Sequence, residues 1–128
     1  YRFDAQLYFA NCGYFAERVT SILAQADPPP RAVLIDASGI NAIDLTAIEA
    51  LEKLNNRLKA QGIQLMFARL KAHAQSALEQ RGFLTTLGAE NVFPTIHAGV
   101  EAFLARDHLP DAPAPDEIKT LIEDAEVA

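Results

Sequence analysis

Two short apolar runs, joined by a longer amphipathic segment, constrain the fold of this chain most strongly. Residues 31–36 and 63–68 carry largely unbroken apolar side chains, as strands buried on both faces do. Residues 44–61 between them place apolar side chains three or four positions apart, which is typical of a helix with one buried face. This order predicts a right-handed βαβ unit with parallel strands.

Proline and glycine divide the rest of the chain into further elements. Gly62 and Gly82 each follow a predicted helix, at the position where a left-handed backbone favours glycine. Phe83 is expected to pack back against the helix that ends before Gly82. We therefore expect an α/β fold with five further elements: a strand at 1–4, a helix over 13–26 capped by Asn11, a helix over 71–81, a strand at 91–93 and a helix over 96–104.

Length and proline content predict one domain followed by a tail. The chain has 128 residues, half of them apolar, which suits a single domain and argues against disorder. We expect this domain to cover residues 1–109. Residues 110–128 are then a proline-containing linker and an acidic tail, in which 116–125 forms one short helix or none. No stretch is long and apolar enough to cross a membrane, so we expect no direct membrane insertion.

The charge is distributed very unevenly along the chain. Residues 107–128 hold seven acidic side chains against Lys119 alone, and this accounts for the whole net charge of −6. Residues 1–106 are neutral overall, without a clustered basic face. Proteins bind the negative charges of nucleic acids and anionic lipids with such basic faces. We therefore expect no binding to nucleic acid or to anionic lipid.

Polar side chains gather where the two parallel strands are predicted to end. The carboxyl ends of parallel strands meet at one edge of a sheet, and functional groups of α/β proteins collect there. Backbone amides at the start of the 44–61 helix favour an anion in the same place. We name these the rim residues and predict two roles for them: regulatory or phosphorylation sites at Ser38 and Thr46, and an interaction or anion-facing surface at Asp36, Asn41, Asp44 and Arg69.

Each rim residue also has a simpler structural role. Asp44 fits the N-cap of the 44–61 helix, and Thr46 fits its first turn. Ser38 and Asn41 are common turn residues. Arg69 is expected to pair with a nearby carboxylate more readily than with a ligand.

Catalytic and metal-binding patterns are missing from the sequence. The three histidines, His73, His97 and His108, lie far apart and are expected at the surface. The single cysteine, Cys12, excludes an internal disulfide and a four-cysteine zinc site, and no histidine or lysine adjoins it to make a nucleophile. Neither a glycine-rich phosphate loop nor a metal-binding motif is present. We expect no enzyme activity, no cofactor and no metal site.

Two segments carry a resemblance to a known family. Residues 1–11 read Y-R-F-D-A-Q-L-Y-F-A-N and are followed by Y-F-A-E-R-V at 14–19. They resemble the opening strand and helix of the STAS domain of SulP-type anion permeases, Y-R-F-D-A-P-L-F-F-A-N and Y-F-R-E-R-V. Residues 34–47 are similar to the D-x-S-x-x-x-x-I-D-x-T-A segment that STAS domains share more widely. The resemblance runs to about Leu104, and it departs at Gln6, where the family has proline.

The resemblance implies both a fold and a cellular context. The fold would be a mixed, largely parallel sheet with helices packed mainly on one side. The domain would be the cytosolic, carboxyl-terminal regulatory part of a transporter for sulfate, bicarbonate or a related anion, at the cytoplasmic face of the inner (plasma) membrane. Its implied partners are the transmembrane domain of the same transporter, a second protomer in a homodimer and a cytosolic regulatory protein.

An alternative comes from the wider family, which includes freestanding anti-sigma-factor antagonists. Those partner-switching proteins are regulated by phosphorylation of the serine that follows the aspartate of a D-S-S-G motif. The resemblance places that aspartate at Asp44 and the serine at Leu45, which has no hydroxyl. Thr46 falls on the neighbouring serine, and Ser38 lies just upstream. The switch could therefore operate here only at a substitute residue.

Overall fold

A three-stranded parallel sheet lies at the centre of the computed structural model, which describes Tyr1 and residues 11–106. The strand order is β1-β2-β3, with β1 at Ala32–Asp36, β2 at Gln64–Ala68 and β3 at Val92–Phe93. Asp36 lies opposite Ala68, which in turn lies opposite Phe93. The carboxyl ends of the three strands therefore meet at one edge, and the predicted α/β fold with a parallel βαβ unit is confirmed.

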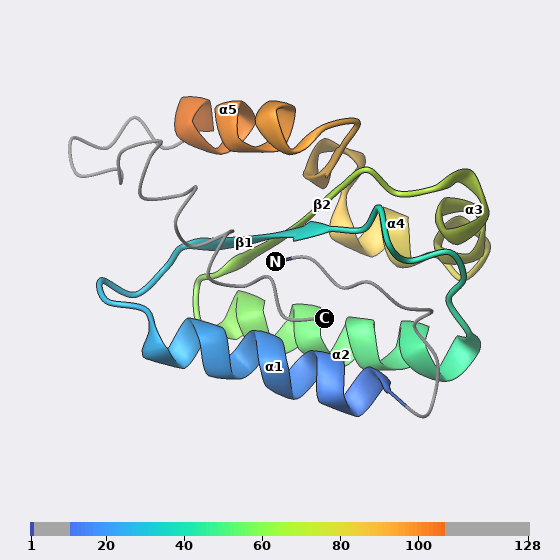
Figure 1. Cartoon of the computed structure of the whole chain (residues 1–128), viewed down its shortest axis with the longest axis horizontal. Coiled ribbons are helices and arrows are strands. Elements are labelled where there is room, and N and C mark those ends of the chain that lie inside the picture. The colour runs from blue at the N-terminus through green and yellow to red at the C-terminus, as the bar shows by residue number, and fades with distance from the viewer. Residues whose placement is uncertain (2–10, 107–128) are drawn as a thin grey trace.

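Helices cover both faces of this sheet (Figure 1). The helices α1 and α2 pack side by side below the sheet in that view, and α5 crosses the opposite face. No helix in the described part of the chain is both long and apolar enough to cross a membrane. The bounds are α1 Cys12–Gln25, α2 Leu45–Ala60, α3 Ala72–Gln80, α4 Phe83–Leu87, the 3-10 helix η1 Ala89–Asn91 and α5 Ile96–Arg106.

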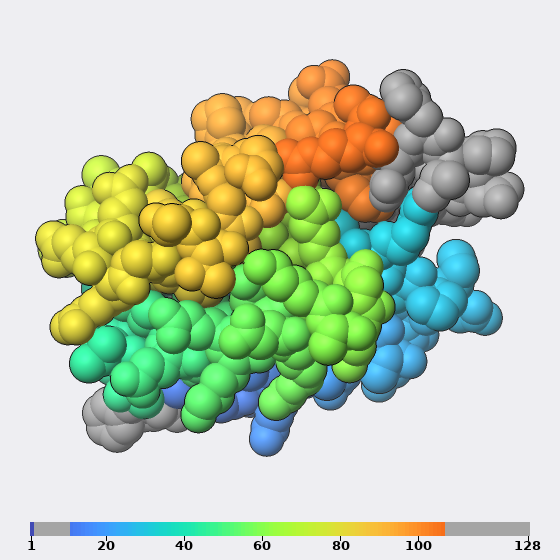
Figure 2. All heavy atoms as spheres, turned by 180° about the vertical axis from the view of Figure 1, so that it is seen from behind, coloured from blue at the N-terminus to red at the C-terminus, as the bar shows by residue number. Residues whose placement is uncertain are grey.

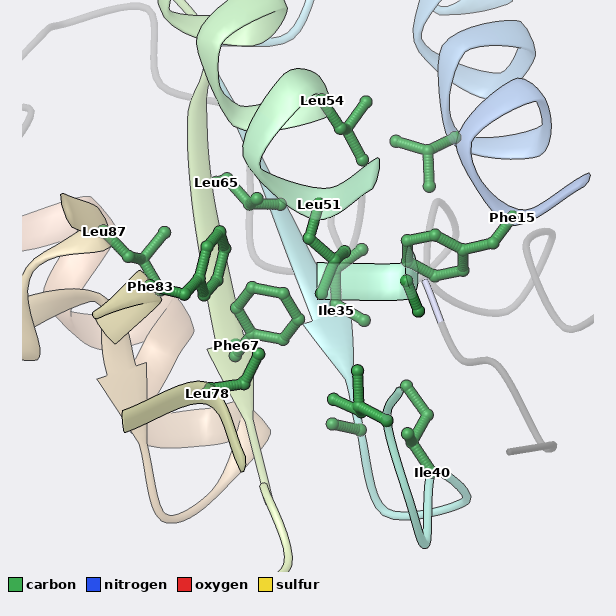
Figure 3. Close-up of a cluster of buried hydrophobic side chains, with 14 of the residues drawn as sticks. Phe15, Ile35, Ile40, Leu51, Leu54, Leu65, Phe67, Leu78, Phe83 and Leu87 are labelled. Atoms are coloured by element: carbon green, nitrogen blue, oxygen red, sulfur yellow. The ribbon is translucent and has the colours of Figure 1, made fainter. Parts of the chain in front are cut away.

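The main hydrophobic core lies between the sheet and the pair α1 and α2 (Figure 3). Ile35 of β1 and Phe67 of β2 enter it, because side chains on one face of a strand alternate with those on the other. The Phe67 ring meets the Phe83 ring edge to face, with 6.2 Å between centroids. Phe15 and Leu51 close the core from the helix side.

The opposite face of the sheet is covered by α5 through a glycine. A Cβ added at Gly99 would lie 3.0 Å from the Leu34 side chain and 3.3 Å from the Phe93 ring. The absence of a side chain at Gly99 therefore lets α5 approach β1 and β3 closely.

Two expectations about local structure need correction. Asn11 precedes α1 as predicted, but its side chain makes no capping hydrogen bond. Its ψ of −5° departs from the extended backbone of an N-cap, whereas Asp44 before α2 has a ψ of 171°. The second correction is α4, which the sequence analysis missed because Phe83 and the four residues after it are too few to show a periodic pattern. The other predicted elements in the described ranges agree with the structure within two residues.

Tyr1 is the described residue of the predicted strand at 1–4. Its backbone nitrogen donates to the Leu34 carbonyl at 2.7 Å, and its carbonyl accepts from the Asp36 amide at 2.6 Å. Tyr1 thus lies along β1, as expected of a residue that continues the sheet. The predicted linker and tail at 110–128 and the predicted domain end at 109 lie outside the described residues.

Candidate functional site

The carboxylate of Asp36 is held by the guanidinium of Arg69 at the carboxyl edge of the sheet. Asp36 ends β1 and Arg69 follows β2, and the parallel register places these two chain positions next to each other. The Arg69 Nε donates to Asp36 Oδ1 at 3.0 Å, and a terminal guanidinium nitrogen donates to Oδ2 at 2.5 Å. The Asp36 side chain is 5% exposed and that of Arg69 is 42% exposed. The pair therefore anchors a surface guanidinium on a buried carboxylate.

Ser38 contributes a further donor to the same carboxylate. Its backbone N–H donates to Asp36 Oδ1 at 3.1 Å, which closes the turn after β1. Burial alone would raise the pKa of the Asp36 carboxyl, but the hydrogen bonds from Arg69 and Ser38 together outweigh it. The pKa of Asp36 is therefore lowered from its ordinary value, and the carboxylate is ionised at neutral pH.

Arg69 adopts a backbone conformation that is rare for residues other than glycine. Its φ is +59°, in the left-handed region, which costs about 1–2 kcal/mol for a residue with a Cβ. The Arg69 N–H donates to the Phe93 carbonyl at 3.0 Å, so the bond to β3 fixes this conformation. Such strain at a strand end aims the Arg69 side chain back over β1 towards Asp36.

The start of α2 presents an apolar and a hydroxyl side chain to solvent. The Asp44 carboxylate accepts a hydrogen bond from the Ala47 N–H at 2.8 Å, which confirms the predicted cap. Leu45 and Thr46 follow in the first turn and are both exposed. Leu45, 46% exposed, is one of two large apolar side chains that are exposed among the described residues, and the other is Tyr14.

Asn41 takes part in a second contact across the loop that connects β1 to α2. Its Oδ1 accepts a hydrogen bond from the Lys71 ammonium at 2.6 Å, and both side chains are exposed. The sequence analysis did not include Lys71 among the candidates. Its position two residues after Arg69, just before α3, was the signal that could have found it.

The rim residues therefore divide into three groups along one edge of the sheet. Asp36, Ser38 and Arg69 form one bonded cluster, while Asn41 pairs with Lys71. Asp44 and Thr46 stand at the start of α2, where Asp44 is engaged as a cap. Arg69 has the carboxylate partner that the sequence analysis expected, so its charge is largely compensated within the protein.

His73 and His97 lie at the surface, as expected from the sequence. His73 is exposed, and so is His97, whose Nε2 lies 2.9 Å from Glu101 Oε1 one turn later on α5. His108 lies outside the described residues. Cys12 is buried at the start of α1. Within the described ranges, no three side chains of His, Cys, Asp or Glu are grouped to hold a metal ion.

Comparison with known proteins identifies the family to which this arrangement belongs. The family model described as "STAS domain" matches residues 1–99, about three quarters of the chain. The chain belongs to the STAS domain family. The parallel sheet edge and the capped start of α2 are thus features of a STAS domain.

Two similar proteins are named as transporters. A probable sulfate transporter of Mycobacterium tuberculosis is 32% identical over 106 residues, which cover 83% of this chain and 19% of that protein. The solved structure of the murine solute carrier 26 family member A9 anion transporter, in an inward-facing state, is 27% identical. Its match covers 81% of this chain and 17% of the other, with a TM-score of 0.73. The chain thus spans about a fifth of the length of such proteins.

A second solved structure is similar in fold. The solved structure titled a putative anti-sigma factor antagonist from Thermotoga maritima matches 77% of this chain and 80% of its own. The TM-score is 0.65 and the identity is 12%, so this likeness supports the fold alone.

Proposed function

We propose that the chain is the cytosolic, carboxyl-terminal regulatory domain of a SulP-type anion transporter and that it modulates transport through protein–protein contacts. The similarity to a probable sulfate transporter and to an anion transporter supports this reading, because each match covers less than a fifth of the larger protein. The partners in this proposal are the transmembrane domain of the same transporter, a second protomer and a cytosolic regulatory protein. The cytoplasmic face of the membrane follows from those partners.

The observation that carries the proposal is the exposed surface at the start of α2. Leu45 and Thr46 project beyond an N-cap, next to a sheet edge that the Asp36–Arg69 pair fixes. Tyr14, 51% exposed, occupies the first turn of α1, and the N-terminal ends of α1 and α2 lie at the same end of the molecule in Figure 1. Exposed aromatic and aliphatic side chains on rigid elements suit contacts with another protein.

Ser38 and Thr46 are the residues at which we propose that phosphorylation regulates those contacts. Thr46 is exposed in the first turn of α2, where backbone amides favour added negative charge. Ser38 is half-buried next to the Asp36–Arg69 pair, so a phosphoryl group there would compete with Asp36 for Arg69. Leu45 cannot accept a phosphoryl group, and this argues against the switch used by the anti-sigma-factor antagonists.

Fractionation of the source cells tests the proposal directly. We expect an antibody against this domain to detect a polypeptide several times heavier than 13.9 kDa in the membrane fraction. A band near 13.9 kDa in the soluble fraction would contradict the proposal and favour the freestanding partner-switching protein. Chemical cross-linking of the membrane fraction then tests for the second protomer, because a homodimer doubles the apparent mass.

A further inference from the structure

A polar pocket lies at the end of the sheet opposite the rim, between α2 and the segment that contains α4 and η1. Its volume is about 420 Å³, within the range of small-molecule sites. In Figure 2 the gold segment near residue 90 lies beside the green part of α2 on the face turned to the viewer. The side chains of interest in its lining are Asn55, Lys59, Thr85 and Glu90.

Two buried asparagines line this pocket, and they differ in their hydrogen bonding. Asn91 is 7% exposed and both ends of its amide are hydrogen-bonded, because Nδ2 donates to the Leu87 carbonyl while Oδ1 accepts from Gln64 and Arg106. Asn55 is only 1% exposed, and its Nδ2 has no hydrogen-bond partner within the described residues. A buried amide nitrogen without a partner is costly, so the Nδ2 group of Asn55 lacks the structural role that the Nδ2 group of Asn91 has.

The pocket also holds two opposite charges that do not pair with each other. The Lys59 ammonium makes one long hydrogen bond, 3.4 Å to the Thr86 carbonyl. The Glu90 carboxylate folds over Gly88, where an added Cβ would lie 2.5 Å from Oε1. No ion pair joins Lys59 to Glu90 in the described structure, so each charge is available to a ligand.

We propose that this pocket binds a small zwitterion of the α-amino acid type. The ligand carboxylate pairs with Lys59 and, once the Asn55 side chain turns towards the pocket, accepts the hydrogen bond that the buried Asn55 Nδ2 lacks, while the ligand ammonium pairs with Glu90. The Thr85 hydroxyl, exposed in the same lining, supplies a further polar contact. The bonded network of Asn91, Gln64 and Arg106 holds one wall of the pocket in place without a ligand.

Calorimetric titration of the full 128-residue chain with the common amino acids, each at millimolar concentration, tests the proposal. We expect saturable binding of at least one amino acid, and no binding of the matching carboxylic acid that lacks the amino group. Lys59→Ala is expected to weaken the affinity about tenfold or more, because it removes the carboxylate partner. Lys53→Ala is the control, since Lys53 is exposed on the same helix outside the pocket, and it should leave the affinity unchanged.

Asn55→Leu separates a binding role from a structural one. If Asn55 serves a ligand, this variant loses binding but unfolds at a higher urea concentration, because it removes a buried amide nitrogen that has no partner. If Asn55→Leu does not fold, the comparison of Lys59→Ala with Lys53→Ala alone decides whether the pocket binds an amino acid. The proposal is overturned if no amino acid binds, if the deaminated acid binds equally well, or if Lys59→Ala leaves the affinity unchanged.

Discussion

Arg69 donates two hydrogen bonds to the buried carboxylate of Asp36 while its own backbone is held in the left-handed region. The two residues lie 33 positions apart in the chain, yet the parallel pairing of β1 with β2 brings them together. The loop from β1 to α2 starts at this pair, so its conformation is set from the core of the sheet. This gives the exposed start of α2 a fixed position, which a surface used for protein contacts requires.

Replacement of Arg69 should separate the contribution of the ion pair from that of the backbone. Arg69→Ala leaves the Asp36 carboxylate buried without its main partner, and we expect a loss of about 2 kcal/mol in the free energy of unfolding. Removing one partner of a fully buried pair costs more, about 3–5 kcal/mol, but the Arg69 side chain is 42% exposed. Arg69→Gly should lose about 1 kcal/mol less than Arg69→Ala, because glycine adopts a φ of +59° without strain. Urea unfolding measures both, and equal losses would show that the backbone at 69 relaxes.

Asp36 should make stability depend on acidity. Its pKa is lowered in the folded protein, so the unfolded chain binds more protons and the free energy of unfolding rises with pH in that range. This contribution is complete above about pH 4, the ordinary range of an aspartate, and is lost as pH falls through the folded pKa. Urea unfolding of the parent and of Asp36→Asn across this range measures the effect. An equally steep decline in both proteins would assign the acid sensitivity to other carboxylates.

Gly99 and Gly13 both lie in helices, yet replacing each by alanine should change the stability of the protein in opposite directions. Gly99→Ala places a methyl group 3.0 Å from Leu34, and we expect a loss of about 1–3 kcal/mol from this overpacking. Gly13→Ala meets no described atom within 4 Å and should add up to about 1 kcal/mol through helix propensity. Thermal unfolding of both variants provides the comparison. A stabilised Gly99→Ala would mean that α5 does not approach the sheet as closely as the structure has it.

The cap of α2 should depend on hydrogen bonding more than on charge. Asp44→Ala removes the acceptor for the Ala47 N–H and is expected to cost about 1 kcal/mol. Asp44→Asn keeps an acceptor oxygen in the same place and should lose much less. Chemical unfolding distinguishes the two variants. If Asp44→Asn is as unstable as Asp44→Ala, the negative charge at the helix start is the more important term.

The sequence predicted the βαβ unit well because each of its parts has a strong local signal. The apolar runs of β1 and β2, the periodic α2 and the cap at Asp44 all agree with one another and with the structure. The same was not true of α4, where Phe83 is buried against Phe67 through a tertiary contact that five residues cannot encode by pattern. The helix α4 was missed because it has no local signal, whereas the predicted Asn11 cap was wrong although asparagine is a common cap residue.

The sequence predicted which residues lie at the candidate site, but not all of the hydrogen bonds and backbone conformations that hold them there. The edge to which Asp36 and Arg69 belong follows from parallel strands, and a carboxylate partner for Arg69 was expected. The left-handed backbone of Arg69 was not expected, because arginine has no preference for that conformation. The Phe93 carbonyl that fixes the conformation comes from a later strand. Asn55 was missed because it lies among the apolar residues of the buried face of α2 and nothing in the sequence marks it as unpartnered.

If the proposed function holds, the rate of anion uptake by the full-length protein depends on the exposed start of α2, and uptake by three variants measures this dependence. The variants are Leu45→Asp and Thr46→Asp at the start of α2, with Ser76→Asp as the control, because Ser76 is also exposed but lies on α3. We expect the Leu45 and Thr46 variants to fold normally and to change the uptake rate several-fold, which corresponds to about 1 kcal/mol of coupling, while Ser76→Asp transports as the parent does. Unchanged uptake in all three variants, with normal amounts of folded protein in the membrane, would contradict a regulatory role for this surface.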